Sequence, residues 1–182
     1  MAVRFWWGSG VVLVLALLMA GCAGAPRLGP EVLPPPSPPS LSARKLALKQ
    51  AINEFRGVPY LSGGTTPHGA DCSGLVQAVY KRAGVNLPRT TAQQFAWGHS
   101  VGQENLEFGD VLFFNQLCKV KVQKAYLAGI LPPDYSELCH NGIYLGQGQF
   151  LHASPARGVH TSRFDDHTWQ SSFMGARRYL EQ

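Results

Sequence analysis

The segment Gly69-Ala-Asp-Cys-Ser-Gly-Leu-Val-Gln-Ala-Val-Tyr80 carries the clearest structural signal in this chain of 182 residues. Counted from Cys72, its apolar residues recur three, four, seven and eight positions later, which is the spacing of one helix face. The pattern predicts a helix that begins at Cys72, with Asp71 near its N-cap. Because unpaired N–H groups and the helix dipole favour negative charge there, we expect the Cys72 thiol to be biased towards thiolate. Taken alone, the segment fits a buried structural cysteine at least as well.

Two histidines farther along the chain supply possible partners for this thiol. His140 opens the run 140–146 and His152 lies in the run 150–154, and both runs read as strands. Gly146-Gln-Gly148 between them predicts a tight hairpin, which would place the two histidines on neighbouring strands. His152 could then orient His140 as the base for Cys72, which is the arrangement that thiol catalysis needs. Either histidine alone could equally be a strand-end hydrogen bonder or a solvated side chain.

The other periodic segments predict an α+β fold, with an antiparallel sheet packed against helices. An opening helix is expected from Leu41, capped by Ser40 or Ser42 and closed by Gly57. A short helix should follow 87–91 and continue through Trp97, and the run 111–114 reads as a compact buried strand. Further strands are expected at 141–145, 149–153, 158–162 and 173–180.

The first forty residues divide into two segments that should lie outside the folded domain. Residues 1–22 read as a signal peptide, with Arg4 before a short apolar run that has the length of a signal h-region. Residues 23–40 contain seven prolines and predict an extended, semi-rigid linker. The catalytic domain is therefore expected at 41–182, outside the cytoplasm.

Composition limits the partners that we expect. Sixteen Lys and Arg residues against eleven Asp and Glu residues give a net charge of +5, which suits an anionic substrate or surface. The basic residues are scattered and no nucleic-acid motif is present, so nucleic acid is not expected as a partner. We expect a monomer that needs no cofactor and no metal.

Several motifs together resemble the NlpC/P60 family. In chain order they are Pro59-Tyr60-x-x-Gly-Gly64, Asp71-Cys-Ser-Gly-Leu-Val76, Leu87-Pro-Arg-Thr-Thr91, Phe108-Gly-Asp-Val-Leu-Phe-Phe114, His140-x-Gly-Ile-Tyr-Leu-Gly146 and Phe150-Leu-His-Ala153. The resemblance covers roughly residues 45 to 180. It implies a papain-like α+β fold and a cysteine peptidase that hydrolyses amide bonds in the stem peptides or cross-links of bacterial peptidoglycan.

The resemblance also assigns roles to individual residues. Cys72 resembles the family's nucleophile, His140 its general base and His152 its third polar residue. The resemblance further implies substrate-binding positions at Tyr60, near the thiol, and at Asp71 and Ser73, which flank the cleft. The chain as a whole looks like the small lipoprotein members of the family, which carry no separate wall-binding domain.

The end of the signal segment resembles a bacterial lipobox. In Leu18-Met-Ala-Gly-Cys22 the last residue would become the lipidated first residue of the mature protein, with palmitate among its acyl chains. Ala23 resembles the sorting pattern for the outer membrane, so we expect an anchored protein of the cell envelope that faces the periplasm. The alternatives are an ordinary secretory signal and an uncleaved anchor in which Cys22 is incidental.

One departure from the family pattern is a long connection at 115–139, which contains Cys118 and Cys139. In an oxidising compartment these two cysteines could form a disulfide that closes the loop. Zinc is a less attractive reading, because His140 already has a catalytic role. The insertion could border or cover the cleft, or it could be a surface loop. A reduced Cys139 could instead pair with Cys72 and inactivate the enzyme.

Three classes of function are compatible with the sequence. A cell-wall cysteine peptidase is favoured because the nucleophile and both histidines are present. A non-catalytic wall-binding or scaffold lipoprotein is the main alternative, and its signature would have been the loss of Cys72 or His140. A papain-like acyltransferase or amidase that acts on another substrate is the third.

Overall fold

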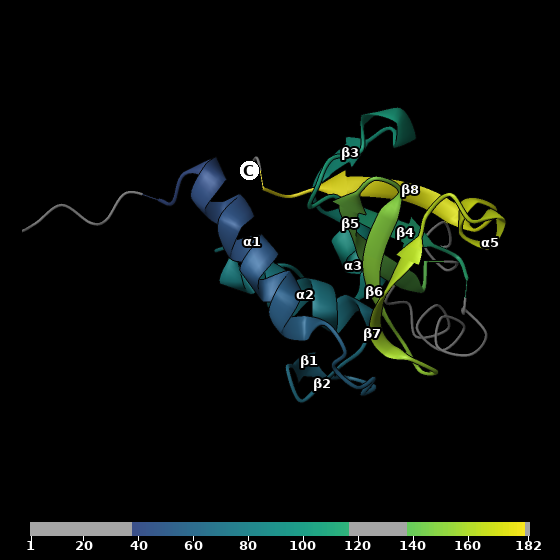
Figure 1. Cartoon of the computed structure of the whole chain (residues 1–182). Coiled ribbons are helices and arrows are strands. Elements are labelled where there is room, and N and C mark those ends of the chain that lie inside the picture. The colour runs from purple at the N-terminus through teal and green to yellow at the C-terminus, as the bar shows by residue number, and fades with distance from the viewer. Residues whose placement is uncertain (1–37, 117–137, 181–182) are drawn as a thin grey trace, which may run out of the picture. The chain divides into compact units, whose positions relative to one another are not determined.

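The longer helices come early along the chain, and the strands of the main antiparallel sheet follow them (Figure 1). The computed structural model describes residues 38–116 and 138–180. The helical elements are α1 (Leu41–Phe55), α2 (Cys72–Arg82), α3 (Thr91–Ala96), the 3-10 turn η1 (Gln103–Asn105) and α5 (His167–Gln170). The strands are β1 (Thr65–Thr66), β2 (Gly69–Ala70), β3 (His99–Val101), β4 (Val111–Phe114), β5 (His140–Gly146), β6 (Gln149–Ser154), β7 (Gly158–Arg163) and β8 (Phe173–Arg178).

The helices begin at residues whose side chains cap them. Ser40 accepts a hydrogen bond from the N–H of Ala43 and starts α1, which resolves the choice between the two serines. Thr90 and Gln93 form a reciprocal capping box at the start of α3. The buried face of α1 packs against α2, and α2 packs in turn against β5 and β6. The predicted helices at 41–57 and from Cys72 onward are therefore confirmed.

Six strands form one antiparallel sheet in the order β3-β8-β4-β5-β6-β7. On one face, Phe113 and Ile143 pack into the main core together with α1 and α2. On the other face, Leu112, Phe114 and Phe150 form a second apolar cluster. Because β4 is buried on both faces, its sequence is continuously apolar, as predicted for a compact buried strand. The α+β fold class is confirmed.

The hairpin between β5 and β6 sets the position of both histidines. Ile143 pairs with Leu151, and Gln147 and Gly148 form the turn with φ values of 53° and 69°. Positive φ at both central residues is typical of a type I′ hairpin turn. In the same register Gly142 lies opposite His152, where a Cβ atom would come within 2.9 Å of the histidine Cβ. The glycine at position 142 therefore leaves room for the side chain of His152 on the neighbouring strand.

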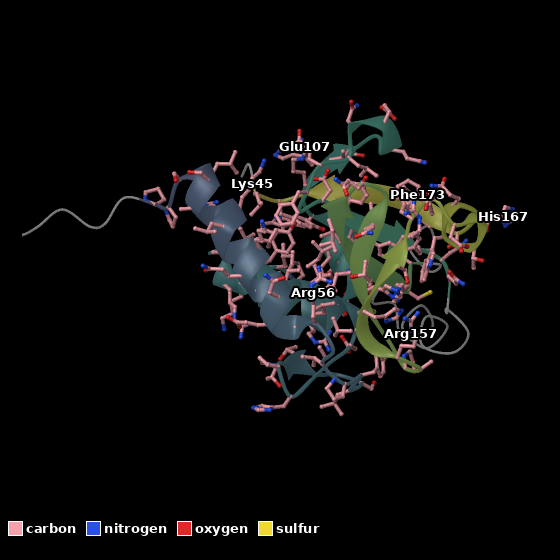
Figure 2. All side chains as sticks on the ribbon, viewed as in Figure 1. Lys45, Arg56, Glu107, Arg157, His167 and Phe173 are labelled. Carbon is pink, nitrogen blue, oxygen red and sulfur yellow. The ribbon has the colours of Figure 1, made fainter. Side chains whose placement is uncertain are left out.

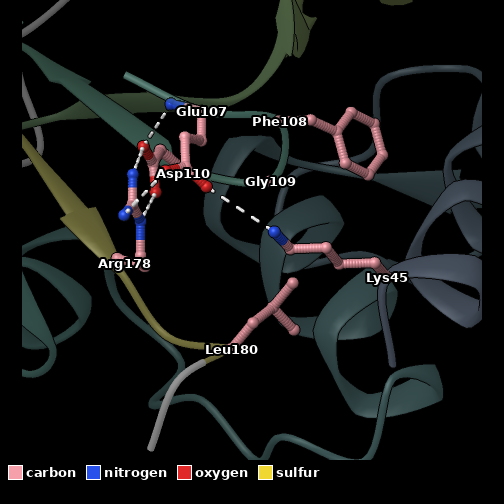
Figure 3. A pocket seen from close by; sticks show the side chains of 7 residues that line it. All are labelled: Lys45, Glu107, Phe108, Gly109, Asp110, Arg178 and Leu180. Atoms are coloured by element: carbon pink, nitrogen blue, oxygen red, sulfur yellow. Dashed lines mark hydrogen bonds and ion pairs between the residues drawn. The ribbon is translucent and has the colours of Figure 1, made fainter. Parts of the chain in front are cut away.

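A small hollow between α1, the loop before β4 and the end of β8 is closed by ion pairs (Figure 3). Its volume is about 10 Å³, which is room for a single water molecule. Asp110 is 1% exposed and accepts hydrogen bonds from Nε and Nη2 of Arg178 at 2.8 and 2.9 Å. Lys45 completes the cluster through Glu107 at 3.6 Å. These charges neutralise one another, and the Asp110–Arg178 pair holds the start of β4 against the end of β8.

Some predictions for the N-terminal segment and the insertion concern residues outside the described ranges. These are the signal peptide at 1–22, the linker at 23–40 apart from its last three residues, Cys22, and Cys118 with most of the insertion 115–139. Within residues 38–116 and 138–180, no helix is both long enough and apolar enough to cross a bilayer.

Candidate active site

The nucleophile candidate is the first residue of α2, as predicted. Asp71 is the N-cap, and its carboxylate accepts hydrogen bonds from the N–H groups of Gly74 and Gly63, both at 2.8 Å. Gly74 must be a glycine here, because a Cβ atom would lie 2.0 Å from the carbonyl oxygen of Gly64. The loop before α2 and the first turn of the helix are thus tied together around Cys72.

An arginine that sequence reasoning left without a role reinforces this cap. Arg89 donates from Nη2 to Asp71 at 2.6 Å and from Nη1 to the Ser73 hydroxyl at 2.8 Å. Burial raises the pKa of Asp71, but the Arg89 hydrogen bond and the two backbone N–H groups outweigh it, so the net shift is downward. Asp71 and Ser73 are therefore committed to internal partners, and their role in substrate binding stays a prediction.

Replacing Asp71 with alanine is expected to lower the free energy of unfolding by about 1–3 kcal/mol, because a helix cap and a partly buried ion pair with Arg89 are lost together. Chemical denaturation would measure the loss. Glu54→Ala is the matched control, because its pair with Arg82 at 3.1 Å is exposed, and it should change stability by less than about 0.5 kcal/mol. Equal stabilities for the two variants would contradict this account of the cap.

The sulfur of Cys72 lies against the backbone on both sides of His140. It is 3.8 Å from the carbonyl oxygen of Cys139 and 3.9 Å from the hydroxyl of Thr91. The N–H groups of Asn141 and Ser73 also interact favourably with its charged form. Within the described residues the sulfur makes no hydrogen bond to a histidine ring, so the thiol and its base are adjacent in the fold but not yet in contact.

The expectation of a thiolate-biased cysteine is wrong for this state of the site. Burial raises the pKa of the Cys72 thiol, and the negative charge of Asp71 raises it further. Hydrogen bonds from Thr91 and from backbone N–H groups act in the opposite direction without reversing the shift. A neutral thiol needs a base to remove its proton, so catalysis depends on the histidines more than the helix start suggested.

The two predicted histidines meet as expected. They stand on adjacent strands, and Nε2 of His140 lies 2.9 Å from Nδ1 of His152. Their side chains are buried, and the rings meet edge to face. Burial, together with the charge of His160, lowers the pKa of His140 to about 4. Burial and the charges of His140, His160 and Arg157 lower the pKa of His152 to about 2. Both rings are therefore neutral at pH 7, and His140 has Nδ1 left to accept a proton.

Aromatic side chains enclose the histidine pair on the sheet face opposite α1. Trp169 of α5 stacks on His140 with ring centroids 5.6 Å apart, and its centroid lies 4.9 Å from that of His152. Phe114 and Phe150 pack around the same rings. Figure 2 shows α5 through the label of His167. The enclosure leaves the two rings little contact with bulk water and explains why both imidazoles resist protonation.

Tyr60 lies near the thiol, in accordance with the prediction. It forms a bridge with Ala70, two residues before Cys72. Burial raises its pKa, and the charges of Cys72 and Asp71 raise it further. Tyr60 is thus close enough to the sulfur to sense its charge and keeps its phenolic proton at neutral pH. Its contact with substrate stays a prediction.

A buried amide network supports the strand that carries His140. Nδ2 of Asn141 donates to Gln94 at 2.6 Å, and Gln94 donates to the carbonyl oxygens of Ser73 and Pro88 at 3.0 and 2.8 Å. The network joins β5 to the first turn of α2. It fixes the relative position of the two halves of the site. Sequence reasoning missed it, because neither amide belongs to a recognisable catalytic pattern.

The described residues contain no group of His, Cys, Asp or Glu side chains that could hold a metal ion. Cys72 is a free thiol. The sulfur of Cys139 lies 3.6 and 3.4 Å from the carbonyl oxygens of Asn115 and Gln116. Because Cys118 lies outside the described residues, its pairing with Cys139 stays a prediction.

Comparison with known proteins agrees with this geometry. The sequence profile of the NlpC/P60 family matches residues 57–178. The chain is 34% identical over 170 residues to the probable endopeptidase NlpC of Escherichia coli K12, covering 92% of this chain and 97% of that protein. It is 37% identical over 130 residues to the murein DD-endopeptidase MepS/murein LD-carboxypeptidase of the same strain, covering 71% of this chain and 60% of the relative.

Solved structures agree as well. A crystal structure of an NlpC/P60 family protein from Bacillus cereus matches with a TM-score of 0.62 and 28% identity, over 79% of this chain and 41% of that one. Several relatives are longer than this chain, which spans 62% and as little as 28% of the length of curated relatives that it matches.

Proposed function

The chain belongs to the NlpC/P60 family, and on this premise we propose that it is a cysteine endopeptidase that hydrolyses amide bonds in peptidoglycan peptides. One observation carries the proposal: a free thiol at a helix start lies 3.8 Å from the carbonyl oxygen of Cys139, next to His140, whose ring is joined to that of His152 by a hydrogen bond of 2.9 Å. The relatives' names, which refer to endopeptidase activity and to murein, support this choice of substrate.

The reaction begins when substrate brings the thiol and its base into contact, as often happens only in the bound complex. Nδ1 of His140 takes the proton of the Cys72 thiol while the sulfur attacks the amide carbonyl carbon. His140 is the base because its Nε2 is already engaged with His152, which holds the ring in place. The negative charge moves to the carbonyl oxygen of the tetrahedral intermediate.

Backbone N–H groups at the start of α2 can stabilise this oxyanion, because the first turn of a helix leaves them without intrahelical partners. One such donor contributes about 3 kcal/mol to the transition state. Tyr60, which keeps its proton, can supply a further donor. The intermediate then expels the amine, which receives the proton from His140, and a thioester remains on Cys72. Water, deprotonated by His140, then attacks the thioester carbon, the C–S bond breaks, and the product leaves as a carboxylic acid that ionises in water. His140 returns its proton to the Cys72 sulfur, which restores the thiol.

Digestion of defined muropeptides tests the proposal. Purified wild-type protein should release fragments with new amino termini, which mass spectrometry identifies, and the Cys72→Ala variant should release none. The masses also show whether the bond between D-glutamate and diaminopimelate or the cross-link between diaminopimelate and D-alanine is cut. Binding to sacculi without any product, in both proteins, would favour a non-catalytic wall-binding protein.

We further propose that the mature protein is a monomer anchored through a lipidated Cys22 to the outer membrane, where it faces the periplasm. The lipobox-like sequence and the proline-rich segment after it support this placement. The anchor would carry palmitate, and a Cys118–Cys139 disulfide would form in the oxidising compartment. Metabolic labelling with palmitate should mark the wild-type protein and leave Cys22→Ala unlabelled, and non-reducing peptide mapping should find the disulfide.

A further inference from the structure

The hydrogen bonds of the histidine pair extend to a third residue, a serine on β7. Nε2 of His152 lies 2.9 Å from the hydroxyl oxygen of Ser162. Ser162 pairs with Phe150 in the β6–β7 ladder, which places it diagonally across from His152 on the neighbouring strand. Within the described residues, Ser162 is the hydrogen-bond partner of this ring nitrogen. The site therefore holds a continuous chain from Ser162 through His152 to His140.

We propose that Ser162 is a positioning residue that sets the tautomer of His152 and thereby keeps His140 in its proton-accepting form. The proposal rests on the function proposed above and deepens it. Ser162 does not touch the reacting atoms in this scheme. Its hydroxyl oxygen accepts a hydrogen bond from the protonated Nε2 of His152 and acts through that ring.

As the third member of a triad, a histidine differs from a carboxylate in its hydrogen bonding. A carboxylate is always an acceptor, whereas a neutral imidazole has one donor and one acceptor nitrogen that can exchange roles. To accept from Nε2–H of His140, His152 must carry its single proton on Nε2 and leave Nδ1 bare. The Ser162 oxygen lies where it can accept that proton's hydrogen bond.

The opposite arrangement would disable the base. If Ser162 donated to Nε2, the proton of His152 would sit on Nδ1 and point at Nε2 of His140. His140 would then carry its own proton on Nδ1, the nitrogen that remains for the thiol, and could not deprotonate Cys72. The direction of one hydrogen bond at Ser162 thus decides whether the site is competent.

The surroundings of His152 also exclude a doubly protonated ring, which would have no tautomer to select. His152 is 1% exposed, and the ring of His160 lies with its centroid 4.2 Å away. Arg157, in the β6–β7 connection, also disfavours a cation there (Figure 2). His152 consequently stays neutral, and its tautomer must be selected by its hydrogen-bond partners.

The test combines kinetics with a direct measurement of the tautomer. In protein labelled with ¹⁵N-histidine and carrying Cys72→Ala, long-range ¹H–¹⁵N correlation spectra should show His152 protonated on Nε2. Adding Ser162→Ala should increase the Nδ1-protonated form. In the active enzyme, Ser162→Ala should lower kcat by about 3- to 10-fold with KM unchanged, as expected for loss of one hydrogen bond. Ser162→Thr, which keeps the hydroxyl, should restore kcat to within about 2-fold of wild type.

Thr161→Val is the matched control, because it removes a hydroxyl from the adjacent position of β7, where the partner is Arg56 at 2.9 Å. It should leave kcat and the tautomer unchanged. Two results would overturn the inference. One is a His152 ring protonated on Nδ1 in the Cys72→Ala protein that keeps Ser162. The other is an unchanged kcat and tautomer in Ser162→Ala. If Ser162→Ala did not fold, the spectrum of the Cys72→Ala protein and the kinetics of Ser162→Thr would still test the inference. An inactive wild-type enzyme would defeat the proposed function, while the spectrum would decide the tautomer separately.

Discussion

Replacing Cys72 with alanine is expected to lower kcat/KM for peptide release from peptidoglycan by about 10⁴-fold or more. Loss of the nucleophile removes the covalent route altogether, and the remaining groups of the site provide only weak catalysis. Single-turnover digestion of a defined muropeptide would measure the loss. Trapping with a thiol-directed reagent should label Cys72 in the wild-type protein.

The fold should survive this change. The polar contacts of the Cys72 sulfur are long, at 3.8 and 3.9 Å, and only one sulfur atom is removed, so Cys72→Ala should keep the free energy of unfolding within about 1 kcal/mol of wild type. A folded Cys72→Ala protein with wild-type activity would rule out the thiol mechanism.

Replacing His140 with glutamine is expected to lower kcat by about 10²- to 10⁴-fold, because a neutral Cys72 thiol then lacks its base. Glutamine retains a polar group that can face His152, so the comparison isolates proton transfer from packing. His68→Gln is the matched control, because His68 is exposed in the β1–β2 hairpin and should leave kcat unchanged. His152→Ala should cause a smaller loss than His140→Gln, since it disturbs only the orientation of the base.

The same histidine predicts the acid limit of activity. The pKa of His140 is lowered to about 4, so its base form persists well below the usual histidine range. The value of kcat/KM should therefore hold until the pH approaches about 4 and then fall as the ring is protonated. A fall in kcat/KM centred near pH 6.5 would instead show that the base is solvated in the working enzyme.

Folding stability should follow the same linkage. The folded pKa of His140 lies below its unfolded value, so the unfolded chain binds more protons as the pH falls from about 6.5 to 4. The contribution of the neutral His140 ring to the free energy of unfolding is fully present above about pH 6.5. It is lost on acidification, by an amount on the order of 3 kcal/mol. Denaturation of His140→Gln across this range should show a shallower loss than wild type.

Local patterns predicted most of the elements, and contacts across the fold account for the rest. The start of α2 could be predicted because its periodicity and its Asp71 cap agree, and β4 because a strand buried on both faces is continuously apolar. The strand β3 was missed, since an exposed edge strand of three residues has no apolar alternation. The helix α5 was missed because four residues are too few for a helical period.

The candidate site shows the same division. Cys72, His140 and His152 were predicted from motifs, whereas Ser162 and Trp169 reach the histidines through contacts that no local spacing encodes. The raised pKa of the thiol was also missed, because its cause is burial by distant segments of the chain. A helix start predicts the direction of a field, but only the fold determines how much water remains.

The hairpin register has a consequence for how this protein can change over time. Side chains alternate between the two faces of β5 and β6, so inserting a single residue within either strand, between its histidine and the turn, would send that ring to the helix side of the sheet if the rest of the strand kept its pairing. Such an insertion could leave a folded protein without a working base. Lineages that carry this fold should therefore accept length changes in the connections and reject single insertions within β5 and β6.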